Sequence, residues 1–135
     1  MNKEVFLSIK KEAEEDLKIP DELTAMMNLA LVLPSIVQKW NEYYTKQNVI
    51  VKKLDIQKAE LYAKLEEEWK FHKNVAWQGR ELNDQILGDP QLLKLERERA
   101  EQNFYLEYIK GTYDNVKGIS FTIKDYLKYK ELIKI

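Results

Sequence analysis

The feature that most constrains the fold is a stretch from Ser35 to about Lys73 that contains neither proline nor glycine. In a helix at about 100° per residue, one side of this stretch collects a largely apolar stripe. Its members are Ile36, Trp40, Tyr43, Gln47, Ile50, Val51, Leu54, Leu61, Leu65, Trp69 and His72. Because spacings such as 40–43–47–50–54 are close to a heptad, the pattern predicts one long helix, about 35–73, packed against a partner helix.

The rest of the first half is also predicted to be helical. The chain has four glycines and three prolines in 135 residues, and it is rich in Leu, Lys and Glu. A short helix is expected over 3–17, and a second begins at Asp21 or Glu22. Pro34 either kinks this second helix or begins a new one.

The second half begins with a predicted connector or turn region over 74–89, with a short helical piece inside it as an alternative. This segment contains two glycines and leads to a proline. Asp89 followed by Pro90 favours a helix start, because Asp caps a helix and proline fits its first position. This helix is expected over 90–117, with Gly118 as its C-cap. Its predicted inner stripe consists of Leu93, Ala100, Phe104 and Tyr108.

A last helix is expected over 122–133, with Ile123, Tyr126, Leu127 and Leu132 inward. Around 104–116 the apolar residues lie nearly all round the helix, which indicates burial on most sides and hence packing between subunits. The fold class is therefore all-α. The chain is interpreted as a single domain, residues 1–135, with an N-terminal part over 1–73 and a C-terminal part over 90–135.

Several classes of function are excluded or disfavoured. The chain has no cysteine, so disulfides and thiolate metal sites cannot form, and it has no glycine-rich phosphate-binding loop. The single His72 lies on the apolar face, and Glu66–Glu68 point in three directions around a helix. The longest apolar stretch, 23–34, is too short to cross a bilayer. We expect no catalytic site, metal, cofactor or membrane partner.

A basic segment is the sharper signal. Residues 39–64 carry six lysines and three acids, a net charge of +3. Four of these lysines, Lys39, Lys46, Lys53 and Lys64, fall within about 40° of one another around the helix expected over 35–73 and form a strip beside its apolar face. Such a strip can follow a phosphate backbone, and Tyr43, Tyr44 and Tyr62 nearby could stack on bases. Alternatively, the lysines are the solubilising edge of a coiled coil. A second basic candidate lies near the C-terminus, with Lys117, Lys124, Lys128, Lys130 and Lys134.

Four sequence pieces, taken together in their order and spacing, carry a resemblance. They are VQKWNEYY (37–44), KLDIQKAELYAKL (53–65), ILGDPQLLKLE (86–96) and VKGISFTIK (116–124). The chain resembles the UvsY-type recombination mediator proteins of T-even-like tailed phages. The resemblance implies a non-enzymatic, helical homo-oligomer, a ring of the hexamer to heptamer class, in the cytoplasm of the infected bacterial host. It also implies binding to single-stranded DNA, weakening of the hold of the phage single-stranded-DNA-binding protein, and loading of a RecA-like recombinase of the UvsX type.

The resemblance also implies site residues. The family motif Leu-Lys-Ala-Arg-Leu, implicated in DNA binding, reads Leu61–Leu65 here, so that Lys64 keeps the charge of the arginine. Tyr62 replaces the motif lysine and can stack. The implied DNA-binding residues are Lys39, Lys46, Lys53, Lys58, Tyr62 and Lys64. The family's C-terminal part drives assembly, which implies a subunit interface of Phe104, Tyr105, Tyr108, Ile109, Tyr113 and Val116. The alternative reading is a helical coiled-coil scaffold or adaptor with no nucleic-acid role.

Overall fold

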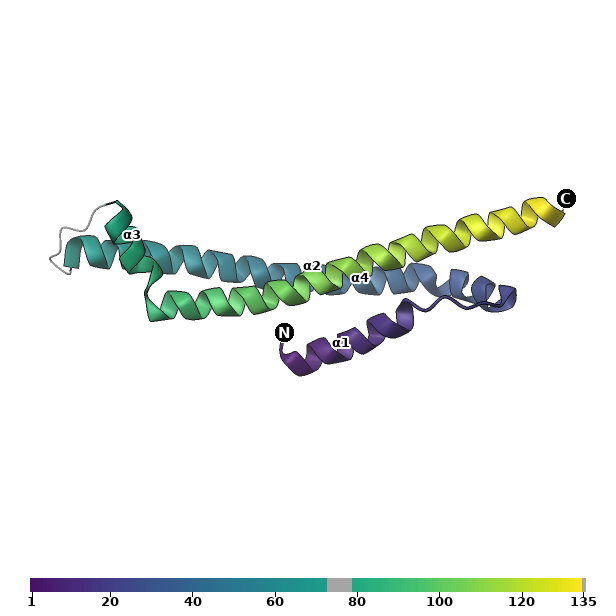
Figure 1. Ribbon diagram of the computed structural model, residues 1–135, viewed down its shortest axis with the longest axis horizontal. Helices are drawn as coiled ribbons and strands as arrows, with labels where there is room; N and C mark the ends of the chain where they lie inside the picture. Colours follow the sequence, from purple (N-terminus) through teal and green to yellow (C-terminus); the bar gives the residue numbers. More distant parts are fainter. Residues whose placement is uncertain (73–78, 135) are drawn as a thin grey trace. The chain divides into compact units, whose positions relative to one another are not determined.

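The computed structural model describes residues 1–72 and 79–134, with side chains described for 1–71 and 79–131. It contains four α-helices and a π-helical segment, and no strand within these ranges (Figure 1). The elements are α1 (Lys3–Asp16), α2 (Leu23–Glu67), the π-helix Glu68–His72, α3 (Arg80–Leu87) and α4 (Pro90–Lys134). The all-α prediction is confirmed. The predicted roles of the His72, Leu132 and Lys134 side chains, and residues 74–78 of the connector, lie outside the described residues.

Two helices begin at side-chain caps. In α1, the Oδ1 atom of Asn2 accepts a hydrogen bond from the backbone N–H of Val5 at 2.8 Å. In α4, the Oδ1 atom of Asp89 accepts from the N–H groups of Gln91 and Leu92 at 2.9 and 3.3 Å. Such caps satisfy donors that have no partner inside the helix. The predicted helix start at Asp89 and Pro90 is therefore confirmed.

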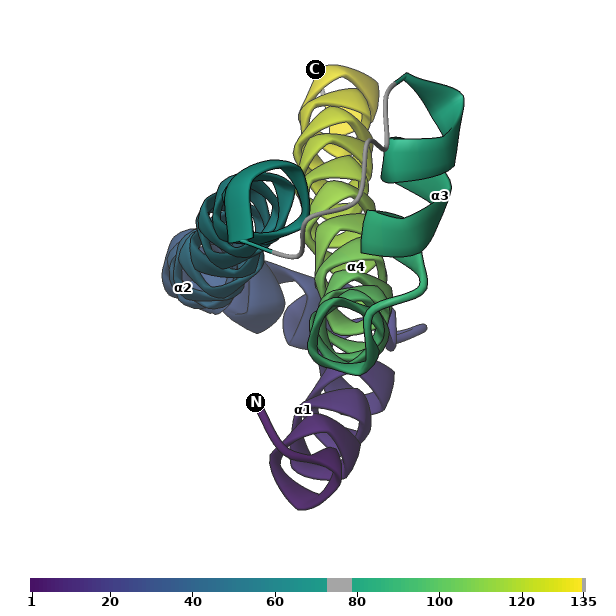
Figure 2. The ribbon, with the colours of Figure 1, turned by 90° about the vertical axis from the view of Figure 1, so that its left-hand side faces the viewer.

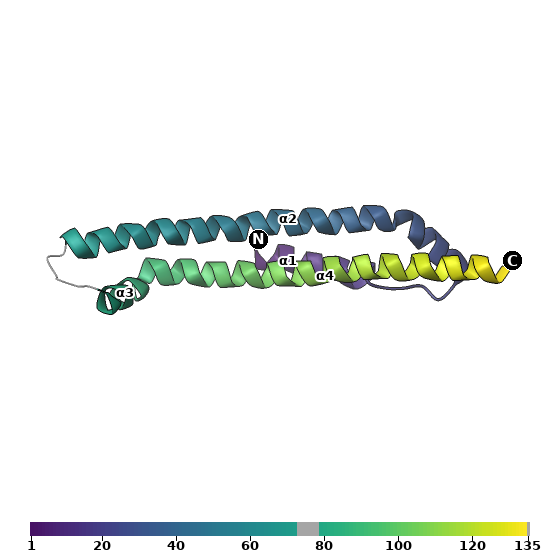
Figure 3. The same cartoon turned by 90° about the horizontal axis from the view of Figure 1, so that it is seen from above.

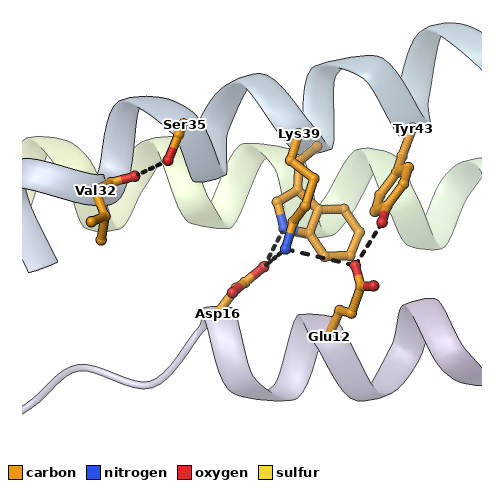
Figure 4. Close-up of polar contacts among 7 residues, drawn as sticks. Glu12, Asp16, Val32, Ser35, Lys39 and Tyr43 are labelled. Carbon is orange, nitrogen blue, oxygen red and sulfur yellow. Dashed lines mark hydrogen bonds and ion pairs between the residues drawn. The ribbon is translucent and has the colours of Figure 1, made fainter.

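Helix α2 runs through Pro34 as one element. A proline inside a helix lacks the N–H that would bond to the carbonyl four residues earlier, which kinks the helix. The neighbouring hydroxyl of Ser35 donates to the carbonyl oxygen of Val32 at 2.7 Å (Figure 4). Of the two alternatives, the structure has the single helix, which continues the apolar face on both sides of the proline.

Helix α4 also runs without a break, through Gly118, so the prediction of two helices separated by a glycine cap is wrong. Among the described glycines only Gly79 has a positive φ, and Gly118 therefore does not adopt the left-handed cap conformation. The hydroxyl of Thr122 donates back to the Gly118 carbonyl at 3.0 Å, as in a helix interior. Val116 and Ile123, which flank the glycine, are both buried, and their packing outweighs the roughly 1 kcal/mol cost of a helical glycine.

This continuity predicts a stabilising substitution. A Cβ atom added at Gly118 would meet nothing within 4 Å, so Gly118→Ala should raise the free energy of unfolding by about 0.5–1 kcal/mol. Urea unfolding followed by circular dichroism measures the change. Gly79→Ala is the matched control, since Gly79 has φ +60° and alanine there is strained. Destabilisation by Gly118→Ala would contradict an unbroken helix at this position.

The chain divides into two compact units. Unit 1 comprises Met1–Gln47 and Tyr105–Ile135, and unit 2 comprises Asn48–Phe104. In each unit a segment of α2 and a segment of α4 run side by side in opposite directions (Figure 3). Each unit thus takes a piece from both halves of the sequence, because antiparallel helices bring distant residues together.

The core of unit 1 joins three helices. One buried cluster contains Ile9 and Ala13 from α1, Leu33 and Trp40 from α2, and Ile109, Val116 and Ile123 from α4. The α2 and α4 members recur at seven-residue spacing, which is the seam of a coiled coil. Helix α1 adds a third layer, where the ring of Phe6 stacks on that of Tyr105 with centroids 4.4 Å apart.

The core of unit 2 is smaller. It contains Leu65 of α2, Leu82 and Ile86 of α3, and Leu92 of α4, and α3 lies next to the first turns of α4 (Figure 2). Helix α3 is amphipathic and only eight residues long, and a helix this short is not stable alone. Its position therefore depends on the burial of the Leu82 and Ile86 side chains.

The predicted inner stripe of α2 is confirmed, whereas that of α4 is wrong. All described members of the α2 stripe are buried or half-buried. In α4, Leu93 and Phe104 are 37% and 62% exposed, while the buried positions include Leu92, Leu106 and Ile109. The reason is that half-buried Arg99 and Gln102 occupy inward positions in the middle of α4 and interrupt its apolar pattern.

Candidate nucleic-acid interface

The four lysines of the predicted strip, Lys39, Lys46, Lys53 and Lys64, all lie on α2, and we call them the α2 lysine strip. The first of them, Lys39, holds α1 against α2 (Figure 4). Its Nζ atom lies 2.6 Å from the Oδ2 atom of Asp16 and 3.6 Å from the Oε2 atom of Glu12. The indole N–H of Trp40 donates to the same Asp16 oxygen at 2.9 Å. Lys39 therefore has two carboxylates of its own chain as partners, and its position is explained by packing within unit 1.

Tyr43 belongs to the same network. Its hydroxyl donates to the Oε2 atom of Glu12 at 2.7 Å (Figure 4). Burial, this hydrogen bond and the nearby negative charges raise the pKa of Tyr43 to about 12, so the hydroxyl remains a donor over the ordinary pH range. The ring of Tyr44 in turn lies parallel to that of Tyr113, with centroids 6.3 Å apart. Both tyrosines thus have partners inside unit 1.

In unit 2, Lys58 and Tyr62 point to neighbours within the unit. The Nζ atom of Lys58 lies 3.6 Å from the Oε1 atom of Glu96 on α4. The hydroxyl of Tyr62 donates to Asn83 of α3 at 2.7 Å, and its ring packs against the unit 2 core. Tyr62, which replaces the motif lysine, therefore connects α2 to α3.

The remaining lysines of the strip are open to solvent. Lys46 in unit 1, and Lys53 and Lys64 in unit 2, are exposed, and none forms an ion pair with a residue in 1–71 or 79–131. Lys64 borders a hollow of about 370 Å³ that is also lined by Glu68, Asp89 and Gln91. These three lysines are the part of the strip that can meet a phosphate without first leaving a carboxylate.

Further basic residues of unit 2 were missed by sequence reasoning, three of them on α2 and the first turns of α4. Lys52, Lys94 and Arg97 are exposed and lack an ion pair among the described residues. Lys52 lies in the same six-lysine segment, but it falls outside the angular range of the strip. The only sequence signal for it was the local net charge, because exposure depends on which side of α2 faces α4.

The residues expected at the subunit interface mostly lie inside unit 1. Tyr105, Ile109 and Val116 are 5%, 0% and 0% exposed, and Tyr108 and Tyr113 are half-buried. Helices α1 and α2 of the same chain cover this segment, which removes the argument that it must pack between subunits. Phe104, in unit 2, is the one predicted interface residue that is exposed, at 62%.

Little else in the described residues points to chemistry. Within 1–72 and 79–134 there is no group of three His, Asp or Glu side chains that could hold a metal ion. No helix there is long and apolar enough to cross a membrane.

Comparison with known proteins places the fold. No protein-family model matches the chain, and no curated protein matches its sequence. Three crystal structures of the bacteriophage T4 recombination mediator protein UvsY do match its structure. The first has a TM-score of 0.76 and 17% identity, and covers 98% of each chain. The other two have TM-scores of 0.75 and 15% identity, and cover 93% and 100% of this chain and 98% and 99% of the other. Over its whole length, this chain has the fold of the T4 recombination mediator protein UvsY.

Proposed function

We propose that the protein is a recombination mediator that binds single-stranded DNA. The observation that carries this proposal is the structural match to UvsY, which has a TM-score of 0.76 and covers 98% of both chains. A mediator needs a surface for DNA and no reaction centre. The exposed lysines of α2 are suited to that role, since phosphate contacts dominate affinity for nucleic acids.

Within this proposal the main DNA contact lies in unit 2. Lys53 and Lys64 are three helical turns apart, which places them on the same side of α2, and neither has a carboxylate partner in the described residues. Lys46, in unit 1, is a further exposed lysine of α2 that is available to a phosphate. Lys58 and Tyr62 stabilise the unit 2 part of α2, because Lys58 forms an ion pair with α4 and Tyr62 a hydrogen bond with α3. In unit 1, Lys39 likewise connects α2 to α1.

The double variant Lys53→Gln with Lys64→Gln tests the contact. Each lysine lost should remove about 0.5–1 kcal/mol of attraction, so affinity for oligo-dT should fall about tenfold at low salt. The slope of log affinity against log salt should also fall by about 1.4, at roughly 0.7 per phosphate contact on a single strand. Fluorescence anisotropy at several salt concentrations measures both quantities.

The matched control is Lys10→Gln with Lys11→Gln, which makes the same charge change at exposed positions of α1. It should leave the affinity nearly unchanged. Equal affinities for the two double variants would remove Lys53 and Lys64 from the interface. An unmodified protein that fails to bind oligo-dT at low salt would instead favour the scaffold alternative, which the seven-residue spacing of the unit 1 seam supports.

The proposed partners follow from the mediator role. The oligomer would weaken the hold of the phage single-stranded-DNA-binding protein and load a RecA-like recombinase of the UvsX type, in the cytoplasm of the infected host. A ring of the hexamer to heptamer class would present the modest basic patch several times and so raise avidity.

The contacts between copies would be formed by exposed apolar side chains. Leu23, Met27 and Leu31 follow one another at four-residue spacing on α2 and are 37%, 53% and 81% exposed. These three side chains of unit 1 are suitable for contact with a second copy, and exposed Phe104 is a separate candidate in unit 2. Tyr105, Ile109 and Val116 would contribute by shaping unit 1 from inside. A surface that contacts a different surface on the next copy generates a ring when the rotation between neighbouring copies closes.

A further inference from the structure

Helix α4 carries a second row of lysines, in unit 1 and on a different element from the α2 lysine strip. Lys110, Lys117 and Lys124 recur at seven-residue spacing, and Lys128 follows one turn later. At about 100° per residue these four lie within about 40° of one another. We call them the α4 lysine strip; from Lys110 to Lys128 it extends for about 27 Å at 1.5 Å per residue.

An exposed aromatic ring lies at the edge of this strip. Phe121 is one turn from both Lys117 and Lys124, and its side chain is 69% exposed. A large apolar ring among charged side chains has no role in the core of unit 1, which is formed from the opposite side of α4 by residues such as Val116 and Ile123. The ring is therefore available to an external partner.

The electrostatics of the strip favour an anion. Lys110, Lys124 and Lys128 form no ion pair with any residue in the described ranges. Lys117 lies 3.4 Å from Asp114, and its Nζ atom is 4.2 Å from the centre of the Tyr113 ring. The two acidic residues between Lys110 and Lys128, Asp114 and Asp125, fall outside the angular range of the four lysines, and of the two only Asp114 forms an ion pair with the strip, at Lys117.

We propose that the α4 lysine strip with Phe121 is a separate contact for single-stranded nucleic acid. One base stacks on the exposed face of Phe121, and the phosphates on either side meet Lys117, Lys124 and Lys128. Aromatic stacking is open to every base in a single strand but not to the paired bases of a duplex. One ring is also too small an apolar surface to anchor a folded protein partner, whose interface would bury about 800 Å² per side.

This inference goes beyond the proposed function, since it concerns unit 1 and does not depend on Lys53 or Lys64. A crosslinking experiment tests it directly. The full-length protein is irradiated with an oligo-dT that contains 5-iodouracil, and the crosslinked peptides are identified by mass spectrometry. A crosslink at Phe121 is expected, because the halogenated base couples to aromatic side chains stacked on it.

A matched pair of variants gives the energetic test. Phe121→Ala should lower affinity for oligo-dT at least about fivefold, as expected for one lost stacking contact, and leave duplex binding unchanged. Tyr129→Ala is the control, because Tyr129 is an aromatic residue of α4 with 59% exposure that lies outside the strip. Native mass and helical content of both variants should equal those of the unmodified protein.

The outcomes separate this contact from the one in unit 2. Loss of binding in the Lys53 and Lys64 variant, with no effect of Phe121→Ala and no crosslink at Phe121, would overturn the inference and keep the proposed function. A fall in native mass on Phe121→Ala would overturn it as well, since the strip would then be a contact between copies of the chain. An effect of Phe121→Ala without any effect of the unit 2 variant would support the α4 contact and count against the unit 2 contact.

Discussion

Replacing Ile109 by Glu is expected to unfold unit 1 and not merely to separate subunits. Ile109 is 0% exposed and lies in one buried cluster with Ile9, Trp40 and Val116. A carboxylate at this position could therefore not be hydrated. An uncompensated buried charge costs about 3–5 kcal/mol, and the lost isoleucine packing adds to that cost. The sum is comparable to the whole stability of a small domain, about 5–15 kcal/mol. Circular dichroism should show lower helical content and a lower Tm.

The destabilisation caused by Ile109→Glu should increase with pH. Burial raises the pKa of the glutamate carboxyl introduced by Ile109→Glu above its ordinary value of about 4. The folded state tolerates the neutral acid better than the anion. The variant should therefore be least destabilised below pH 4 and should lose stability as the pH rises through the raised pKa. Urea midpoints at pH 4 and pH 7, compared with the unmodified protein, measure the difference.

Leu31→Glu is the matched control for Ile109→Glu. It introduces the same charge at a position that is 81% exposed. The folded chain should keep its helical content, and a lower native mass would place Leu31 in a contact between copies. If Ile109→Glu kept full helicity and lost only its native mass, residue 109 would lie between subunits, contrary to its burial within the chain.

Trp40→Ala is expected to have the second largest effect on stability. Trp40 is 0% exposed and is the largest of the fully buried side chains. Truncation of a buried tryptophan typically costs about 3–5 kcal/mol, because the surrounding residues close the cavity only in part. The change also removes the indole donor from Asp16, which then keeps Lys39 as its partner. The free energy of unfolding from urea titrations measures the cost.

An exposed aromatic residue provides the comparison for Trp40. Phe71 is 74% exposed, so Phe71→Ala should change the unfolding free energy by about 0.5 kcal/mol or less. A small effect of Trp40→Ala, similar to that of Phe71→Ala, would show that α1 and α2 do not pack through Trp40. If Trp40→Ala greatly lowers the free energy of unfolding but the folded fraction binds DNA with unchanged affinity, Trp40 contributes to stability and not to DNA binding.

The structure divides the α2 lysine strip by role. Lys39 forms ion pairs with α1, and Lys58, which the family resemblance added, forms one with α4. Lys46, Lys53 and Lys64 remain open among the described residues. This division follows from where acidic residues of other helices lie, which spacing along one helix does not show.

The sequence by itself determined the helical class, the inner face of α2 and the cap at Asp89. These features depend on local chemistry: the 3.6-residue period, the absence of breakers and the side chain that precedes Pro90. The order of four short sequence pieces was also enough to indicate the UvsY-like fold that the structural comparison shows.

Only the tertiary structure decided the continuity of α4, its inner face and the partners of each lysine. Gly118 has the local signature of a helix end, but the buried residues on either side of it hold the helix together. Arg99 interrupts the apolar pattern on the inner face of α4, so that this face cannot be recognised from the sequence. The charge can lie there because the Nε atom of Arg99 is 2.6 Å from the Oδ1 atom of Asp55, a residue 44 positions away in sequence. The burial of Ile109 likewise depends on α1 and α2. The physical reason is the same in each case: packing and ion pairing between helices act between residues far apart in sequence, and their free energies exceed the local propensities that a single stretch reveals.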